Sequence, residues 1–201
     1  MKEYEIVLTY LNGCAGEAHP MTSFEEAELA FSDFRVLDRR TQKDAQLLIW
    51  KSDLIILSGG HVPTQNAFFQ EIGLKELIRD YQGLILGISA GTMNAAERVY
   101  VQPEEAGESV PEFPRFAEGL GLTRLNVLPH YQMMKDAWLD GKRLFEDITF
   151  ADSMGNTFYA LPDFSYIVDD GKQAVLYGEG YRLQDGVMTQ IARHGDKVIL
   201  Y

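Results

Sequence analysis

The 201-residue chain has a single cysteine, Cys14, and no hydrophobic run that approaches the roughly 20 residues needed to span a membrane. One cysteine cannot form an intramolecular disulfide, and such scarcity is typical of proteins in a reducing compartment. The first five residues, 1–5, lead into a short strand-like run and not into the apolar segment of a secretory signal. We therefore expect a cytoplasmic protein that has no membrane partner.

Basic residues are also scarce, since 18 Lys and Arg face 30 Asp and Glu and give a formal net charge of -12. A field of that sign repels polyanions, so we expect no nucleic-acid partner. The net charge does not restrict a small substrate, because a binding site can be locally positive within an acidic protein.

Several motifs of metal and cofactor sites are missing from the sequence. It contains no H-E-x-x-H pair, no Cys/His cluster and no glycine loop with the spacing of a nucleotide-binding or dinucleotide-binding motif. We therefore expect a protein that works without a metal ion and without an organic cofactor.

Short β-rich runs alternate with helical patterns, which is typical of an α/β fold with a mostly parallel sheet flanked by helices. The length suits a single domain over residues 1–201. Ser23 followed by Glu26 has the spacing of a capping box and predicts a helix through about Phe34. Strands are expected at 6–10, 53–58, 83–88 and 126–128, and further helices at 44–50, 66–81, 92–97 and 138–148.

The last quarter of the chain has a different pattern. Strand-like runs are joined by Asp-Gly and His-Gly turns, which predicts antiparallel hairpins appended to the sheet. The expected strands lie at 158–161, 165–168, 174–177, 186–192 and 197–201. Residues 102–114 are rich in Glu, Pro and Gly and form the one long loop that the sequence predicts; such loops are often functional.

Gly87-Ile88-Ser89-Ala90-Gly91 matches G-x-S-x-G, the pattern of a nucleophilic serine at a sharp turn from strand to helix. Small residues on both sides let the backbone reverse, and the serine Oγ is then exposed at the carboxyl end of the sheet. An apolar strand precedes Ser89 and a helical pattern follows it, as the motif requires. The alternative is a glycine-rich turn with an incidental serine.

A second glycine pair, Gly59-Gly60, also follows an apolar strand. The carboxyl ends of parallel strands open on one edge of a sheet, where ligands bind. We therefore predict that the amides of Gly60 and Ala90 form an oxyanion hole; a tight turn that needs glycine is the alternative. His61 comes next in the chain and would either contact substrate or cap the following helix.

The sequence offers four histidines as a general base for Ser89. His130 ends a strand, whereas His194 lies in a hairpin turn and His19 in an early loop. One candidate triad joins Ser89, His130 and a later acid. The other follows the order Ser…Asp…His and would use Asp163 and His194. We favour His130, because a hairpin turn is a poor place for a buried base.

In these motifs the chain resembles the peptidase E (aspartyl dipeptidase) and cyanophycinase family of serine peptidases. The members of that family are similar to class I glutamine amidotransferase domains with flavodoxin-like layering, in which serine replaces the nucleophilic cysteine. The resemblance covers about residues 50 to 170. It rests on the segments at 57–60, 87–91, 119–122 and 129–131.

The resemblance implies that Ser89 is the nucleophile and His130 the general base. Asp163 stands where the family offers a glutamate to the histidine, and Glu104 is the reserve candidate for the acid. Arg143 stands near the position of an arginine that recognises the aspartyl carboxylate of the substrate, since a guanidinium suits a carboxylate.

The expected function is hydrolysis of small peptides, with aspartyl dipeptides as one candidate class, through an acyl-enzyme. Two alternatives stay open: an esterase or amidohydrolase that uses the same triad on a non-peptide substrate, and a non-catalytic binding domain on an amidotransferase-like scaffold. The expected partner is a small peptide or amide, and a homodimer is left open beside a monomer.

Overall fold

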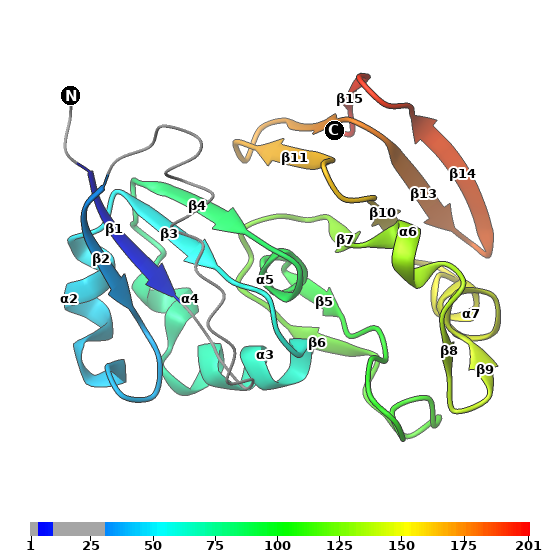
Figure 1. Ribbon diagram of the computed structural model, residues 1–201, viewed down its shortest axis with the longest axis horizontal. Helices are drawn as coiled ribbons and strands as arrows, with labels where there is room; N and C mark the ends of the chain where they lie inside the picture. Colours follow the sequence, from blue (N-terminus) through cyan, green and yellow to red (C-terminus); the bar gives the residue numbers. More distant parts are fainter. Residues whose placement is uncertain (1–3, 10–30) are drawn as a thin grey trace. The chain divides into compact units, whose positions relative to one another are not determined.

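The computed structural model describes residues 4–9 and 31–201, which fall into two compact units, Met1–Thr92 and Met93–Tyr201 (Figure 1). Each unit is described by itself. Within the described residues, no helix combines the length and the apolar character needed to cross a membrane.

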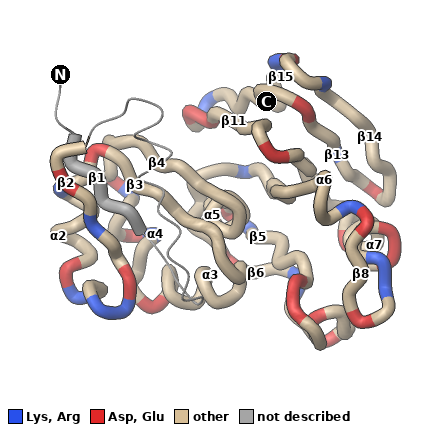
Figure 2. The backbone as a smooth tube through the Cα atoms, in the orientation of Figure 1, with Lys and Arg blue, Asp and Glu red and all other residues tan. Residues whose placement is uncertain are grey.

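The first unit contains a parallel four-stranded sheet with the strand order β2-β1-β3-β4. The strands are β1 (Tyr4–Thr9), β2 (Phe31–Val36), β3 (Leu54–Leu57) and β4 (Leu84–Gly87). β3 and β4 carry no charged residue, and both are drawn in tan in Figure 2. Leu57 pairs with Gly87, so β3 and β4 end at the same level. The segments that follow these two strands therefore leave the sheet at the same edge.

Helices accompany this sheet and lie along one side of it in Figure 1. They are η1 (Gln42–Asp44), α2 (Ala45–Trp50), α3 (Val62–Glu71) and α4 (Leu74–Leu77).

The helix predicted at 66–81 is wrong in its bounds. It begins earlier, because a proline occupies the first turn of α3, where its missing N–H is not needed. It is then interrupted at Gly73, whose φ of 62° lies in the left-handed region.

The end of the helix predicted from Ser23 to Phe34 is also wrong. Residues 23–30 lie outside the described residues, as do Cys14 and His19, but Phe31–Val36 form β2 beside β1. Phe31 and Phe34 pack against the buried Ile56 of β3. Burial of these rings against the sheet outweighs the local helical spacing.

The second unit contains a mixed sheet with the order β14-β13-β10-β7. Only β7 and β10 are parallel, and Phe158, Tyr159 and Ala160 pair with residues 126–128. β10 also pairs antiparallel with β13, and β13 with β14. The strands are β7 (Asn126–Leu128), β10 (Thr157–Ala160), β13 (Gly180–Gln184) and β14 (Val187–Ala192).

An antiparallel sheet with the order β11-β12-β15 completes the C-terminal part. Leu176 of β12 lies on the face of this sheet that packs in a core with Leu125, Leu161 and Ala192. The predicted C-terminal hairpins are therefore confirmed, although β13 was not among the predicted strands. The strands are β11 (Tyr166–Asp169), β12 (Ala174–Tyr177) and β15 (Lys197–Ile199).

The helix predicted at 138–148 is wrong for most of its length. Asp140 and Gly141 have φ values of 51° and 78°, which suit a tight hairpin turn and close β8 against β9. A π-helical turn, η2 (Leu144–Thr149), follows and runs into α7 (Phe150–Asp152). The strands of the hairpin are β8 (Trp138–Leu139) and β9 (Lys142–Arg143).

The fold is thus mixed α/β with sheets flanked by helices. A parallel sheet is confirmed for the first unit, whereas the sheet of the second unit is mixed. The single domain and the amidotransferase-like layering stay predictions.

Candidate active site

Ser89 lies at a sharp turn between β4 and the short helix α5 (Ala90–Asn94). Its φ of 52° lies in the left-handed region, which residues other than glycine adopt at a cost of about 1–2 kcal/mol. Hydrogen bonds on both sides hold this backbone: Ile88 N–H donates to Leu57 O at 2.9 Å, and Gly91 N–H donates to Ser58 O at 3.0 Å. These two bonds hold the Ser89 turn against the neighbouring end of β3.

The two glycines of the pentad are required by close packing. A Cβ at Gly91 would lie 2.0 Å from the carbonyl oxygen of Leu57, and a Cβ at Gly87 would lie 2.8 Å from Cα of Thr92. Both obstacles are backbone atoms, which cannot move aside as a flexible side chain can. The G-x-S-x-G pattern thus places a glycine at each point where the turn packs closely against backbone atoms.

The Gly59-Gly60 pair lies beside the serine. A Cβ at Gly59 would stand 3.3 Å from Cβ of Ser89, and Gly60 has a φ of 143°. Within the described part of the chain, the backbone amides of Gly60 and Ala90 donate no hydrogen bond. Two N–H donors are therefore available near the Ser89 turn.

His61 occupies the N-cap position of α3 in extended conformation. Its side chain makes no capping bond to the backbone, and Nδ1 lies 2.9 Å from the Thr64 hydroxyl. Its carbonyl accepts the Gln65 amide at 3.0 Å. The residue thus starts the helix through its backbone rather than through a capping imidazole, and contact with substrate stays a prediction.

His130 lies two residues after the end of β7, at the N-cap of α6, and has a left-handed φ of 58°. Its Nδ1 donates to Oδ1 of Asp163 at 2.7 Å, because a carboxylate can only accept. Both side chains are partly exposed, at 35% and 41%. In a neutral imidazole with this bond, Nδ1 carries the proton and Nε2 keeps its lone pair.

Pairing of β7 with β10 brings these two residues together from positions 33 apart in the sequence. The ladder continues past the strand ends, since Leu161 N–H donates to Leu128 O at 2.9 Å and Tyr131 N–H donates to Leu161 O at 3.0 Å. The Tyr131 ring lies 5.2 Å from the Phe145 ring and 4.7 Å from the Tyr181 ring. Burial raises the pKa of the Tyr131 phenol, with nearby carboxylates adding to the shift, so this ring serves as a neutral packing element.

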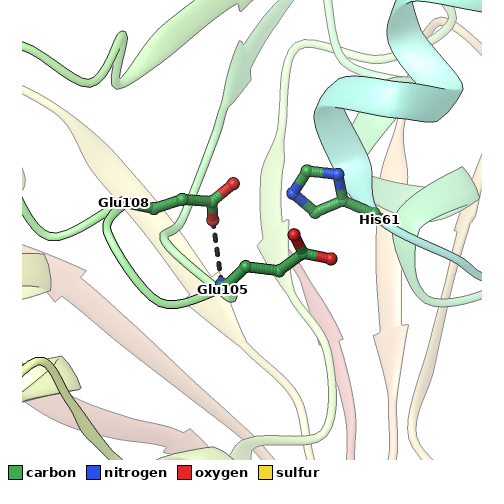
Figure 3. A group of neighbouring side chains, drawn as sticks. All are labelled: His61, Glu105 and Glu108. Carbon is green, nitrogen blue, oxygen red and sulfur yellow. Dashed lines mark hydrogen bonds between the residues drawn. The ribbon is translucent and has the colours of Figure 1, made fainter.

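Glu104 lies in the predicted loop, which has no strand between Gln102 and Arg115. Its backbone N–H donates to the Glu108 carboxylate at 2.8 Å. The Glu105 N–H donates to the same carboxylate at 3.0 Å, the bond drawn in Figure 3. The Asp140 carboxylate accepts from Gly107 N–H at 2.9 Å and so links the loop to the β8–β9 hairpin. The loop therefore has defined internal structure. The carboxylate that bonds to His130 in the structure is Asp163 rather than Glu104.

The Arg143 guanidinium makes a two-pronged contact with Asp147, in which Nε donates at 3.2 Å and an Nη at 2.8 Å. The Arg143 backbone N–H donates to the same carboxylate at 2.8 Å. These contacts lower the pKa of Asp147 to about 2, and the bonds from the guanidinium are the largest cause. To bind the carboxylate of a substrate, this guanidinium would have to share or release Asp147.

We expect Arg143→Ala to raise the pKa of Asp147 from about 2 part of the way toward the ordinary value of about 3.9, because the backbone hydrogen bond survives. A depressed pKa stabilises the fold above the unfolded-state value and loses that contribution as the pH falls toward 2. The variant should therefore lose less stability than wild type between about pH 4 and pH 2. A carboxyl ¹³C NMR titration measures the shift, and Lys135→Ala is the control, because this exposed cation is not among the groups that act on Asp147. An unchanged Asp147 titration in Arg143→Ala would contradict the assignment.

Two features lie apart from these groups. His194 is exposed in the turn between β14 and β15. A cavity of about 520 Å³ in the first unit is lined by Asp53 and Gly83, which precede β3 and β4. It therefore opens at the amino ends of the strands, opposite Ser89, and is not the nucleophile site.

One residue near the dyad was missed. The Gln132 side chain accepts a hydrogen bond from Asp163 N–H at 3.0 Å. Its place two residues after His130 was the only signal in the sequence, and nothing in that spacing indicated a contact with residue 163.

Comparisons with known proteins identify the family and a similar fold. The chain is similar in fold to a crystal structure of a candidate peptidase E protein from Listeria monocytogenes EGD-e, with a TM-score of 0.60 and 16% identity over 95% of this chain and 89% of that one. A search of curated proteins finds no significant match. The family model for Peptidase family S51 matches residues 19–177. The chain therefore belongs to peptidase family S51.

Proposed function

We propose that the protein is a serine peptidase of the peptidase E type that hydrolyses small peptides through an acyl-enzyme on Ser89. The observation that carries the proposal is the backbone of Ser89, held at a φ of 52° by glycines whose replacement would collide with backbone atoms. Strain of this kind persists where the surroundings enforce it, and it is concentrated at active sites. Membership of a peptidase family makes hydrolysis of an amide the first chemistry to test.

In the proposed mechanism, His130 Nε2 takes the proton of the Ser89 hydroxyl while Oγ attacks the carbonyl carbon of the peptide. Asp163 supports this role by accepting the Nδ1 proton, which fixes the tautomer and stabilises the imidazolium that forms. The oxyanion accepts hydrogen bonds from the Gly60 and Ala90 amides. His130 then protonates the leaving amine, and a water molecule deprotonated by His130 releases the acid and restores Ser89.

The substrate class proposed is short peptides, with aspartyl dipeptides first. Residues 102–114 suit a size limit, because hydrogen bonds to Glu108 and Asp140 give this loop a defined shape. Arg143 is the proposed contact for an acidic side chain. A substrate carboxylate would replace or share the existing partner, so recognition would be weaker than at a vacant guanidinium.

The test is labelling with a small fluorophosphonate, followed by mapping of the adduct by mass spectrometry. We expect an adduct on Ser89 in wild type, none in His130→Ala, and an unchanged adduct in His194→Ala, a matched control at an exposed turn. A panel of dipeptides, esters and amides then identifies the substrate class. If folded wild-type protein gives no Ser89 adduct and turns over no member of the panel, the proposal is wrong.

A further inference from the structure

We propose that Gln132 is a positioning residue that holds Asp163 within reach of His130; this inference rests on the proposed function. Asp163 lies beyond the end of β10, where the backbone ladder with β7 has stopped at Leu161. The position of its carboxylate is therefore set by contacts other than strand pairing.

Two contacts define the backbone at this point. Ser165 N–H donates to Pro162 O at 3.2 Å and closes a turn around Asp163. That bond shapes the turn but does not tie it to the segment that carries His130. Asp163 N–H donates to Gln132 Oε1 at 3.0 Å, and Gln132 belongs to α6 (Tyr131–Met134), which starts directly after His130. The amide oxygen thus joins the two segments whose side chains form the dyad.

Asp163 is held by two hydrogen bonds that reinforce each other, one through its side chain and one through its backbone. His130 Nδ1 donates to the Asp163 side chain at 2.7 Å, while the Asp163 backbone donates to Gln132. Without the second bond, the turn is free to rotate its carboxylate away from the imidazole. Because the donor is a backbone N–H, the atom of Gln132 that faces it must be the oxygen. Glutamate therefore keeps the bond, whereas methionine has a similar length and loses it.

The experiment compares Gln132→Met and Gln132→Glu with wild type and with Gln184→Met, the same change at an exposed glutamine of β13. The first readout needs no substrate: the ¹H resonance of the His130 Nδ1 proton in ¹⁵N-labelled protein. We expect it to broaden or vanish in Gln132→Met and to persist in Gln132→Glu and Gln184→Met. The second readout is the split between kcat and KM, in which Gln132→Met lowers kcat about fivefold with KM unchanged and Gln132→Glu restores it, as the loss of one exposed hydrogen bond would cause.

The outcomes separate the two proposals. Retention of both the resonance and kcat in Gln132→Met would overturn the positioning role. If wild type fails to turn over any substrate, the proposed function fails, and the positioning role in catalysis falls with it even when the resonance behaves as expected. If Gln132→Met is less stable in urea while Gln132→Glu matches wild type in stability but not in kcat, the residue is structural and the inference is wrong.

Discussion

Alanine at Ser89 or at His130 should lower kcat/KM toward the best dipeptide by about 10⁴- to 10⁶-fold, and the double variant should lose no more than either single variant. In the proposed mechanism the two groups act in one proton transfer, so removal of either would leave the other without a catalytic role. Alanine at Asp163 should cost less, about 10⁴-fold or below, because the imidazole keeps part of its basicity without an oriented Nδ1 proton.

Purified variants with matched thermal unfolding are assayed over the same substrate range, and His194→Ala, which should keep wild-type activity, is the control for expression and folding. If the losses at Ser89 and His130 multiply in the double variant, the two side chains act independently, and the proposed proton transfer between them does not occur.

Gly91→Ala should lower the free energy of unfolding by about 3 kcal/mol or more, at the upper end of overpacking effects. Its Cβ would lie 2.0 Å from Leu57 O and 2.4 Å from the Leu57 carbonyl carbon, both in the backbone of β3. To relieve this contact, the Ser89 turn would have to move away from the sheet. Catalysis should therefore fall together with stability.

Gly155→Ala is the matched control for this effect. Gly155 has a positive φ, 72°, which Gly91 does not, and no atom lies within 4 Å of its hypothetical Cβ. The control should lose only about 1 kcal/mol, from backbone strain alone. Urea unfolding measures both variants; equal losses would mean that Gly91 is needed for neither close packing nor the shape of the turn.

The sequence predicted the elbow well because its determinants are local. Gly87, Ser89 and Gly91 lie within five residues, and the two glycines are required by backbone contacts close to the turn, Gly87 with Thr92 and Gly91 with the end of β3. His130 was placed correctly at a strand end for a similar reason, since β7 is a short apolar run. Features of this kind need no knowledge of distant parts of the chain.

The pairing of Asp163 with His130 was harder to predict from the sequence. Asp163 reaches His130 because β10 lies parallel to β7 in one register, and local patterns do not report register between strands so far apart. Asp163 was chosen from a family resemblance, with Glu104 in reserve. The contact with Gln132 could not be predicted at all, since it joins a helix side chain to a backbone amide beyond a strand.

The wrong helices have a common physical origin. At 138–148 the apolar spacing resembled a helix, but Asp140-Gly141 adopts positive φ values that close a hairpin. At 31–34 the same ambiguity was decided by packing of two phenylalanines on β3. Short apolar runs fit both periodicities, and tertiary packing selects between them.

The register between β7 and β10 also determines where the chain can accept insertions without disturbing the pairing of His130 with Asp163. Residues 136–156 lie between α6, which follows His130, and β10, so their number can vary without moving His130 relative to Asp163. A single-residue insertion within Thr157–Ala160 would instead turn each following side chain to the opposite face. Homologues of this chain should therefore vary in length across the hairpin and π-helical turn, and hold their length between the start of β10 and the acid.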